Sequence, residues 1–166
     1  AKTNWSTQVA YTTDTYHVSL VGALKYNGWT DSYYTTSLGK ARPSGNSTNY
    51  GLRGYWRPDS ESQAIPEISA GYDISTVEGQ DADTDAYFVG LTWKDTFQAD
   101  DKIGIALGQP QTADTDTETP FTWEAYYSYK VNDSVSVTPA IFGATDRTGT
   151  SGVDITGAVV QTTFKF

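Results

Sequence analysis

Thr156-Gly-Ala-Val-Val-Gln-Thr-Thr-Phe-Lys-Phe166 is the stretch of sequence that decides the fold. One parity holds Thr156, Ala158, Val160, Thr162, Phe164 and Phe166, and the other includes Gly157, Gln161, Thr163 and Lys165. Because successive side chains of a strand point to opposite faces of a sheet, the first face is apolar and the second largely polar. The terminus of a soluble domain usually frays into polar residues, whereas an apolar strand ending on an aromatic side chain suits a strand that faces lipid. The pattern therefore predicts a transmembrane β-barrel.

The composition of the whole chain favours an all-β fold. Its 166 residues suffice for one domain, and Gly 15 and Tyr 12 accompany abundant β-branched side chains. No apolar run approaches the roughly 18 residues of a membrane-spanning helix. The 11 basic and 20 acidic residues give a net charge of −9, which argues against nucleic-acid binding. With Cys 0, disulfides and thiolate metal sites are excluded.

Alternation continues through the chain and predicts nine antiparallel strands. In chain order, the expected strands are Thr3–Thr13, Thr15–Tyr26, Thr48–Arg57, Pro66–Thr76, Ala86–Thr96, Lys102–Gln109, Pro120–Val131, Ser134–Thr145 and Val153–Phe166. Within each strand one parity is mainly apolar and the other is polar or small. This is the pattern that the outer wall and the water-filled lumen of a membrane barrel require.

Aromatic side chains often lie near the ends of the apolar parity. Examples are the pairs Trp5 and Tyr11, Tyr16 and Tyr26, Tyr50 and Trp56, Tyr87 and Trp93, and Trp123 and Tyr129. Ten residues of a strand tilted by about 45° rise about 23 Å, which matches two interfacial girdles around an apolar band about 25 Å tall. The alternative is that these side chains fill the core of a soluble sandwich, where they need not prefer strand ends.

Connections of alternating length indicate the orientation of the strands. Short links at Asp14, Gln98–Asp101 and Asn132-Asp133 alternate with longer ones such as Asn27–Ser47, Val77–Asp85, Pro110–Thr119 and Asp146–Gly152. Bacterial outer-membrane barrels have short periplasmic turns and longer extracellular loops, so Phe166 is expected on the periplasmic side. Nine strands do not suit an even-stranded barrel, and an open sheet edge does not survive in lipid. We therefore expect further strands before Ala1.

An ordered set of segments carries a specific resemblance. The segments are Tyr50-Gly-Leu-Arg-Gly-Tyr-Trp-Arg-Pro58, Pro66-Glu-Ile-Ser-Ala-Gly-Tyr72, Tyr87-Phe-Val-Gly-Leu-Thr-Trp-Lys94, Gly104-Ile-Ala-Leu-Gly-Gln-Pro110, Phe121-Thr-Trp-Glu-Ala-Tyr-Tyr127, Val137-Thr-Pro-Ala-Ile141 and Phe164-Lys-Phe166. From about Asn49 onward the chain resembles the C-terminal part of cyanobacterial Som-type porins, in the OprB-like carbohydrate-selective porin family.

The resemblance implies a barrel of about sixteen strands, of which residues 1–166 would form the C-terminal portion of one pore domain. It implies passive diffusion of small hydrophilic solutes and inorganic ions through a water-filled channel in the lipid bilayer of the outer membrane, often as a homotrimer. It also implies an N-terminal surface-layer-homology domain, which nothing in this chain matches. The remaining N-terminal part of the same porin is thus an expected partner. No catalysis, no cofactor and no nucleic-acid partner is expected.

The candidate pore-lining residues belong to the polar parity. They are Lys25, Arg53, Tyr55, Arg57, Glu67, Asp73, Lys94, Glu124 and Tyr126. Lys102, Lys130 and Lys165 share this parity, and an excess of positive charge in a narrow aqueous channel concentrates anions. Alternatively, several of these lysines merely decorate the periplasmic mouth. The loop Gly28–Asn46 is long enough to fold inward, and its possible constriction residues are Tyr33, Tyr34, Lys40 and Arg42.

Other chemistry is sparse. His17 and Ser19 share a strand face but lack an orienting third group, so they are better interpreted as polar lining than as a hydrolytic pair. Asp81–Asp85 begins like a calcium loop, yet Ala86 and Thr92 occupy the positions of the required Gly and Glu. No catalytic residue and no metal site is predicted. The alternative function is a soluble, secreted β-barrel that binds a small apolar ligand. That barrel would turn its apolar parity inward, whereas a membrane barrel turns it outward.

Overall fold

The computed structural model describes residues 1–29, 45–59, 64–79, 83–113, 116–147, 149 and 151–166. Its strands are β1 (Thr3–Thr12), β2 (Tyr16–Tyr26), β3 (Ser47–Trp56), β4 (Glu67–Val77), β5 (Thr84–Lys94), β6 (Lys102–Ala113), β7 (Phe121–Asn132), β8 (Val135–Thr145) and β9 (Ile155–Phe164). The nine predicted strands are confirmed, although several of their ends shift. In the described ranges, no helix has the length and apolarity needed to cross a membrane.

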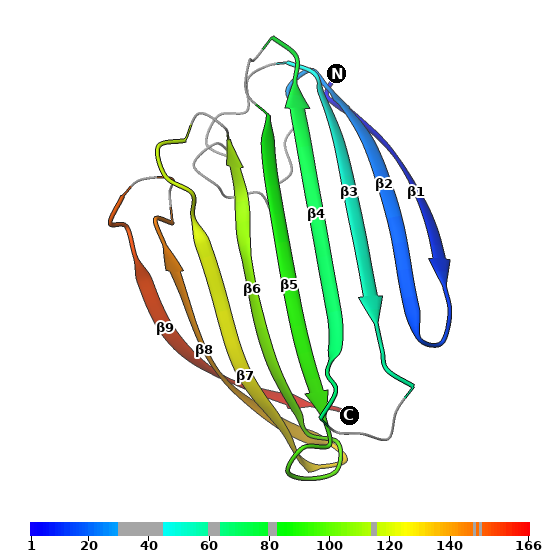
Figure 1. The fold of residues 1–166 in the computed structure, drawn as a ribbon, viewed down its shortest axis with the longest axis vertical. Coiled ribbons are helices and arrows are strands. Elements are labelled where there is room, and N and C mark those ends of the chain that lie inside the picture. Colours follow the sequence, from blue (N-terminus) through cyan, green and yellow to red (C-terminus); the bar gives the residue numbers. More distant parts are fainter. Residues whose placement is uncertain (30–44, 60–63, 80–82, 114–115, 148, 150) are drawn as a thin grey trace.

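All nine strands form one open antiparallel sheet in which each strand pairs with the next along the chain. Figure 1 shows them side by side from β1 (blue) to β9 (red), in a curved ribbon. The two chain ends lie at opposite ends of the sheet (Figure 1). The turns β1–β2, β5–β6 and β7–β8 lie at the end of the sheet that holds the C-terminus (Figure 1), which we call the tight-turn end. We call the opposite end the long-loop end.

The apolar face of the sheet is largely uncovered. The register keeps one parity on each face, so that Leu20 lies opposite Leu52. Leu20, Leu52 and Val160 are 54%, 50% and 68% exposed, and Leu91 is half-buried. Among the described residues, the buried apolar side chains are only Val77, Ala113, Pro120 and Ala144. The apolar parity therefore does not pack into a dry centre.

The polar face is the concave one. A hollow of about 600 Å³ is lined by residues of the polar parity from each of the strands β4 to β9, namely Asp73, Phe88, Ala106, Glu124, Phe142 and Ile155. Side chains of so many neighbouring strands can surround one hollow only if the sheet bends towards it. Several polar side chains on this face are nearly enclosed, including Ser19 and Ser75. The convex face is consequently the apolar one.

One strand is longer than the alternation predicts. The expected loop Pro110–Thr119 is wrong at its start, because β6 continues through Pro110 to Ala113. Tyr87 pairs with Gln109 and Asp85 with Thr112, so the register shifts as β6 passes Pro110. At such an irregularity the ladder tolerates a proline, which has no N–H to donate.

Two expectations about the connections are also wrong. The β7–β8 turn consists of Asp133 and Ser134 rather than Asn132-Asp133, because Asn132 pairs with Val135 and its side-chain oxygen accepts a hydrogen bond from the Ser134 N–H at 2.9 Å. The link lengths do not alternate strictly, because the connection 57–66 at the tight-turn end is longer than the connection 78–83 at the long-loop end.

Candidate functional site

The register brings the predicted wall residues onto the concave face. Arg53 lies opposite Ser19 and Gly71, Asp73 opposite Gly51, Glu67 opposite Thr92, Lys94 opposite Lys102, and Glu124 and Tyr126 opposite Ala106 and Gly104. Tyr55 and Lys25 share that face on β3 and β2, and Arg57 directly follows β3. The prediction that these residues share one face is confirmed. Tyr33, Tyr34, Lys40 and Arg42 lie outside the described residues.

An ion pair occupies the middle of this face. The Arg53 Nη2 lies 2.5 Å from the Asp73 Oδ2, while Nη1 donates to the backbone carbonyls of Leu52 and Tyr72. The guanidinium also lies 5.4 Å from the centre of the Phe88 ring, two strands away. The charge of Arg53 is thus largely compensated, and its side chain is held along the wall.

Glycines on neighbouring strands make this flat arrangement possible. A Cβ on Gly51 would lie 2.6 Å from the Asp73 Oδ1, and a Cβ on Gly71 would lie 2.8 Å from the Arg53 Cδ. A Cβ on Gly104 would likewise meet the Tyr126 hydroxyl at 2.6 Å. Asp73, Arg53 and Tyr126 each therefore lie over a glycine of the adjacent strand. Their bulk stays close to the sheet and does not project across the concavity.

A second network runs along the tight-turn end of the same face. The His17 and Tyr55 rings stack with centroids 5.2 Å apart, and the Arg57 guanidinium lies 4.2 Å from the centre of the Tyr55 ring. Glu67 Oε1 then accepts both Arg57 Nε at 3.4 Å and Lys94 Nζ at 2.6 Å. The carboxylate of Glu67 is therefore shared by cations from two different strand ends.

Two other residues of this face are wholly or partly enclosed by their neighbours. Lys25 is only 7% exposed, so it contributes little to the open surface of the wall. His17 Nδ1 lies 2.7 Å from the Thr12 Oγ1, and its ring faces Tyr55, so its contacts are those of a packed residue rather than of a hydrolytic pair. In the described part of the chain, no group of three or more His, Asp or Glu could hold a metal ion.

The concave face is less polar than the alternation suggested. Phe88, Phe142, Ile155 and Val159 have the inward parity, and Phe142 lies over Gly157, where a Cβ would approach its Cζ to 2.6 Å. In the sequence, these residues can be recognised because each lies an even number of positions from a polar-parity residue of its own strand. The polar or small character expected of this face is therefore interrupted by apolar side chains in β5, β8 and β9.

Asp101 organises the β5–β6 turn at the tight-turn end. Its side chain is 0% exposed, and it accepts hydrogen bonds from the backbone N–H groups of Thr96, Phe97 and Gln98 and from the Tyr127 hydroxyl. Burial opposes its ionisation, but these donors together outweigh burial and lower the pKa of Asp101. The carboxylate is enclosed by its own loop, so it acts as a local clasp for residues 95–101.

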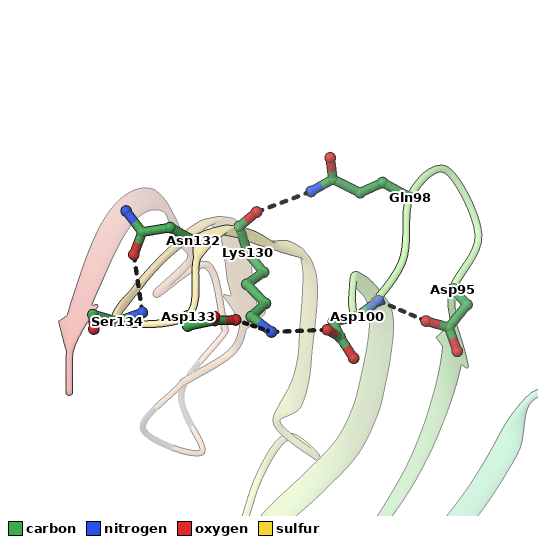
Figure 2. Close-up of polar contacts among 7 residues, drawn as sticks. All are labelled: Asp95, Gln98, Asp100, Lys130, Asn132, Asp133 and Ser134. Carbon is green, nitrogen blue, oxygen red and sulfur yellow. Dashed lines mark hydrogen bonds and ion pairs between the residues drawn. The ribbon is translucent and has the colours of Figure 1, made fainter.

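Lys130 joins this turn to the next one. Figure 2 shows its ammonium between Asp100, at 2.9 Å, and Asp133, at 3.0 Å. Gln98 Nε2 donates to the Lys130 carbonyl at 3.4 Å, and the Asp100 N–H donates to Asp95 at 2.6 Å. The β5–β6 and β7–β8 turns are consequently held side by side through one lysine.

Comparison with known proteins identifies one similar chain. The protein is 29% identical over 164 residues to the uncharacterized protein alr4550 of Nostoc sp. (strain PCC 7120 / SAG 25.82 / UTEX 2576), and the match covers 91% of this chain. The chain spans only 28% of the length of that relative. No family model and no solved structure matches the present chain.

The close contact between glycines and the side chains that lie over them predicts the effect of adding one methyl group. Gly104→Ala should lower the free energy of unfolding by about 1–3 kcal/mol, because the new Cβ displaces the Tyr126 ring. Gly22→Ala is the matched control, since its Cβ would meet only the Tyr50 ring at 3.9 Å. Urea-unfolding midpoints measure both effects. Equal midpoints for the two variants would contradict the proposed packing.

The clasp at Asp101 predicts a pH-dependent loss of stability. Because the folded-state pKa is lowered, the carboxylate stabilises the fold fully above its unfolded value of about 3.9, and this contribution disappears as the pH falls through the folded value. Asp101→Asn should therefore lower the urea midpoint at pH 7 and differ progressively less from the parent below about pH 4. Asp14→Asn, in the exposed β1–β2 turn, should leave the midpoint unchanged.

Proposed function

We propose that this chain forms part of the wall of an outer-membrane porin, a water-filled channel for passive diffusion of small hydrophilic solutes and ions. The observation that carries the proposal is the division between the two faces of one curved sheet. The convex face presents large uncovered apolar side chains, and the concave face presents charged and polar ones. Uncovered apolar area on this scale is unfavourable in water and favourable against lipid.

The strand directions support a wall that needs more strands to close. In a sheet where each strand is antiparallel to the next, β1 and β9 run in the same direction. Direct pairing of β1 with β9 would be parallel, whereas membrane barrels close by antiparallel pairing. We propose that an odd number of further strands lies between them in the closed barrel. Sixteen strands would satisfy this condition. We further propose that such barrels assemble into a homotrimer.

Ion pairs on the concave face determine how much net charge the proposed channel would present to passing ions. Arg53 is paired with Asp73, and Glu67 is shared by Arg57 and Lys94. These ion pairs reduce the excess of positive charge that the sequence alone indicates. We therefore propose that selectivity depends on the balance of these pairs along the wall, with a modest preference for anions.

The proposal predicts that the two faces respond differently to a charge. Leu20 and Val21 are neighbours near the middle of β2, on the convex and the concave face respectively. Leu20→Arg should destabilise the protein in lipid bilayers by about 2–4 kcal/mol, because the guanidinium would enter hydrocarbon. Val21→Arg should cost much less, because its side chain enters water. Urea unfolding in liposomes measures both variants.

Detergent dependence tests the soluble alternative. A secreted ligand-binding barrel would stay monodisperse without detergent. It would turn the apolar parity inward, so Leu20→Arg would destabilise it as well, by burying a charge in the ligand cavity. Monodispersity of the parent in detergent-free buffer would therefore overturn the membrane proposal in favour of that alternative. Dependence on detergent, together with intolerance at Leu20, would support the porin.

Releasing Arg53 should change ion selectivity. Asp73→Asn removes the carboxylate charge that compensates Arg53, so the reversal potential in planar bilayers should shift towards anions. Glu124→Gln, on the same face, is the matched control because it removes one negative charge outside the Arg53–Asp73 pair. The shift should be larger for Asp73→Asn. A shift no larger than that of the control would mean that the pair does not control the charge of Arg53.

A further inference from the structure

A hollow of about 410 Å³ lies on the concave side of the tight-turn end. The ends of β5 to β8 and the segment around β9 all contribute to it. Its basic residues are Lys94, Lys102, Lys130 and Lys165, and its hydroxyl residues are Ser128, Ser134, Ser136 and Thr163. Residues far apart in the sequence thus bring ammonium and hydroxyl donors to one concavity.

Two of the four lysines are committed to carboxylates. Lys130 is held between Asp100 and Asp133, as Figure 2 shows, and Lys94 is held by Glu67. Asp101, which also lines the hollow, is occupied by three backbone N–H groups and the Tyr127 hydroxyl. Of the four aspartates that line the hollow, Asp100 and Asp133 thus share one lysine charge, and Asp101 is held by neutral donors.

Lys102 and Lys165 are different. Among the described residues, neither lysine lies within ion-pair distance of a carboxylate. Lys102 also lies directly opposite Lys94 on the same face of adjacent strands. Like charges at directly opposed positions destabilise a sheet, and Glu67 compensates Lys94 but does not lie within ion-pair distance of Lys102. Of the remaining acids, Asp95 lines the hollow but accepts the Asp100 N–H.

We propose that this hollow binds a phosphomonoester dianion. Lys102 and Lys165 supply the compensating charge, and the hydroxyls of Ser128, Ser136 and Thr163 supply neutral donors around the phosphate oxygens. Strong acceptor oxygens and a charge near −2 match this donor set. The hollow is also of a size that accommodates a small organic group attached to the phosphate. The proposal rests on the concave face alone and does not require the sheet to form a channel.

Isothermal titration of the purified protein tests the site with two probes of the same chemistry. Glycerol 3-phosphate represents a free solute, and dihexanoyl phosphatidic acid represents a lipid headgroup. Binding of either probe supports the site, and the tighter one identifies the source. Glycerol, which lacks the phosphate, should not bind. Failure of both phosphate probes to bind would overturn the proposal, whatever the outcome of the channel recordings.

The variant Lys102→Gln/Lys165→Gln tests the assigned residues. Each lost charge-assisted hydrogen bond should weaken binding about tenfold. Binding should also strengthen between pH 5 and pH 7, as the second phosphate proton is lost near pH 6. Lys2→Gln, at the long-loop end, is the control and should bind like the parent. The double variant should have a urea midpoint no lower than the parent's, because Lys102→Gln removes a like charge opposite Lys94. Parental affinity in a folded double variant would refute the assignment.

Discussion

The unbroken antiparallel ladder of backbone hydrogen bonds is the constraint on which the rest of the structure depends. The described residues have almost no buried apolar core, so strand pairing from β1 to β9 holds the chain together. Because side chains alternate along each strand, the register transmits one choice of face from strand to strand, and it shifts near strand ends, between Asp85 and Tyr87 and between Lys130 and Asn132. Even the irregularity beside Pro110 leaves the faces of Leu107 on β6 and Val89 on β5 matched.

Curvature then gives the two faces different physical tasks. On the convex side, large apolar groups spread apart and stay uncovered, which suits the proposed contact with lipid. On the concave side, side chains converge, so large groups need room and like charges need partners. Glycines opposite Asp73, Arg53 and Tyr126 let these groups lie along the wall. Ion pairs meanwhile limit the electrostatic cost of bringing like charges together on one surface.

The tight-turn end is the most organised part of the polar structure. Asp101 shapes one turn, Lys130 connects it to the next, and Glu67 joins the ends of β3 and β5 through Arg57 and Lys94. These contacts hold neighbouring turns in place where the ladder itself ends. They also leave Lys102 and Lys165 as the cations at this end with their charge uncompensated by described carboxylates, which is why the proposed phosphate site falls there.

Periodicity alone determined the number of strands and which residues of each strand share a face. It therefore placed Arg53, Glu67, Asp73 and Tyr126 on one face, because parity is a local property of an extended chain. It misplaced the β7–β8 turn by one residue, since side-chain capping by Asn132 is not visible in a hydrophobic pattern. Only the tertiary structure decided the partners of these side chains. Which glycine underlies a ring, or which carboxylate meets Arg53, follows from register between strands and from curvature. Both arise from the pairing of segments distant in the sequence.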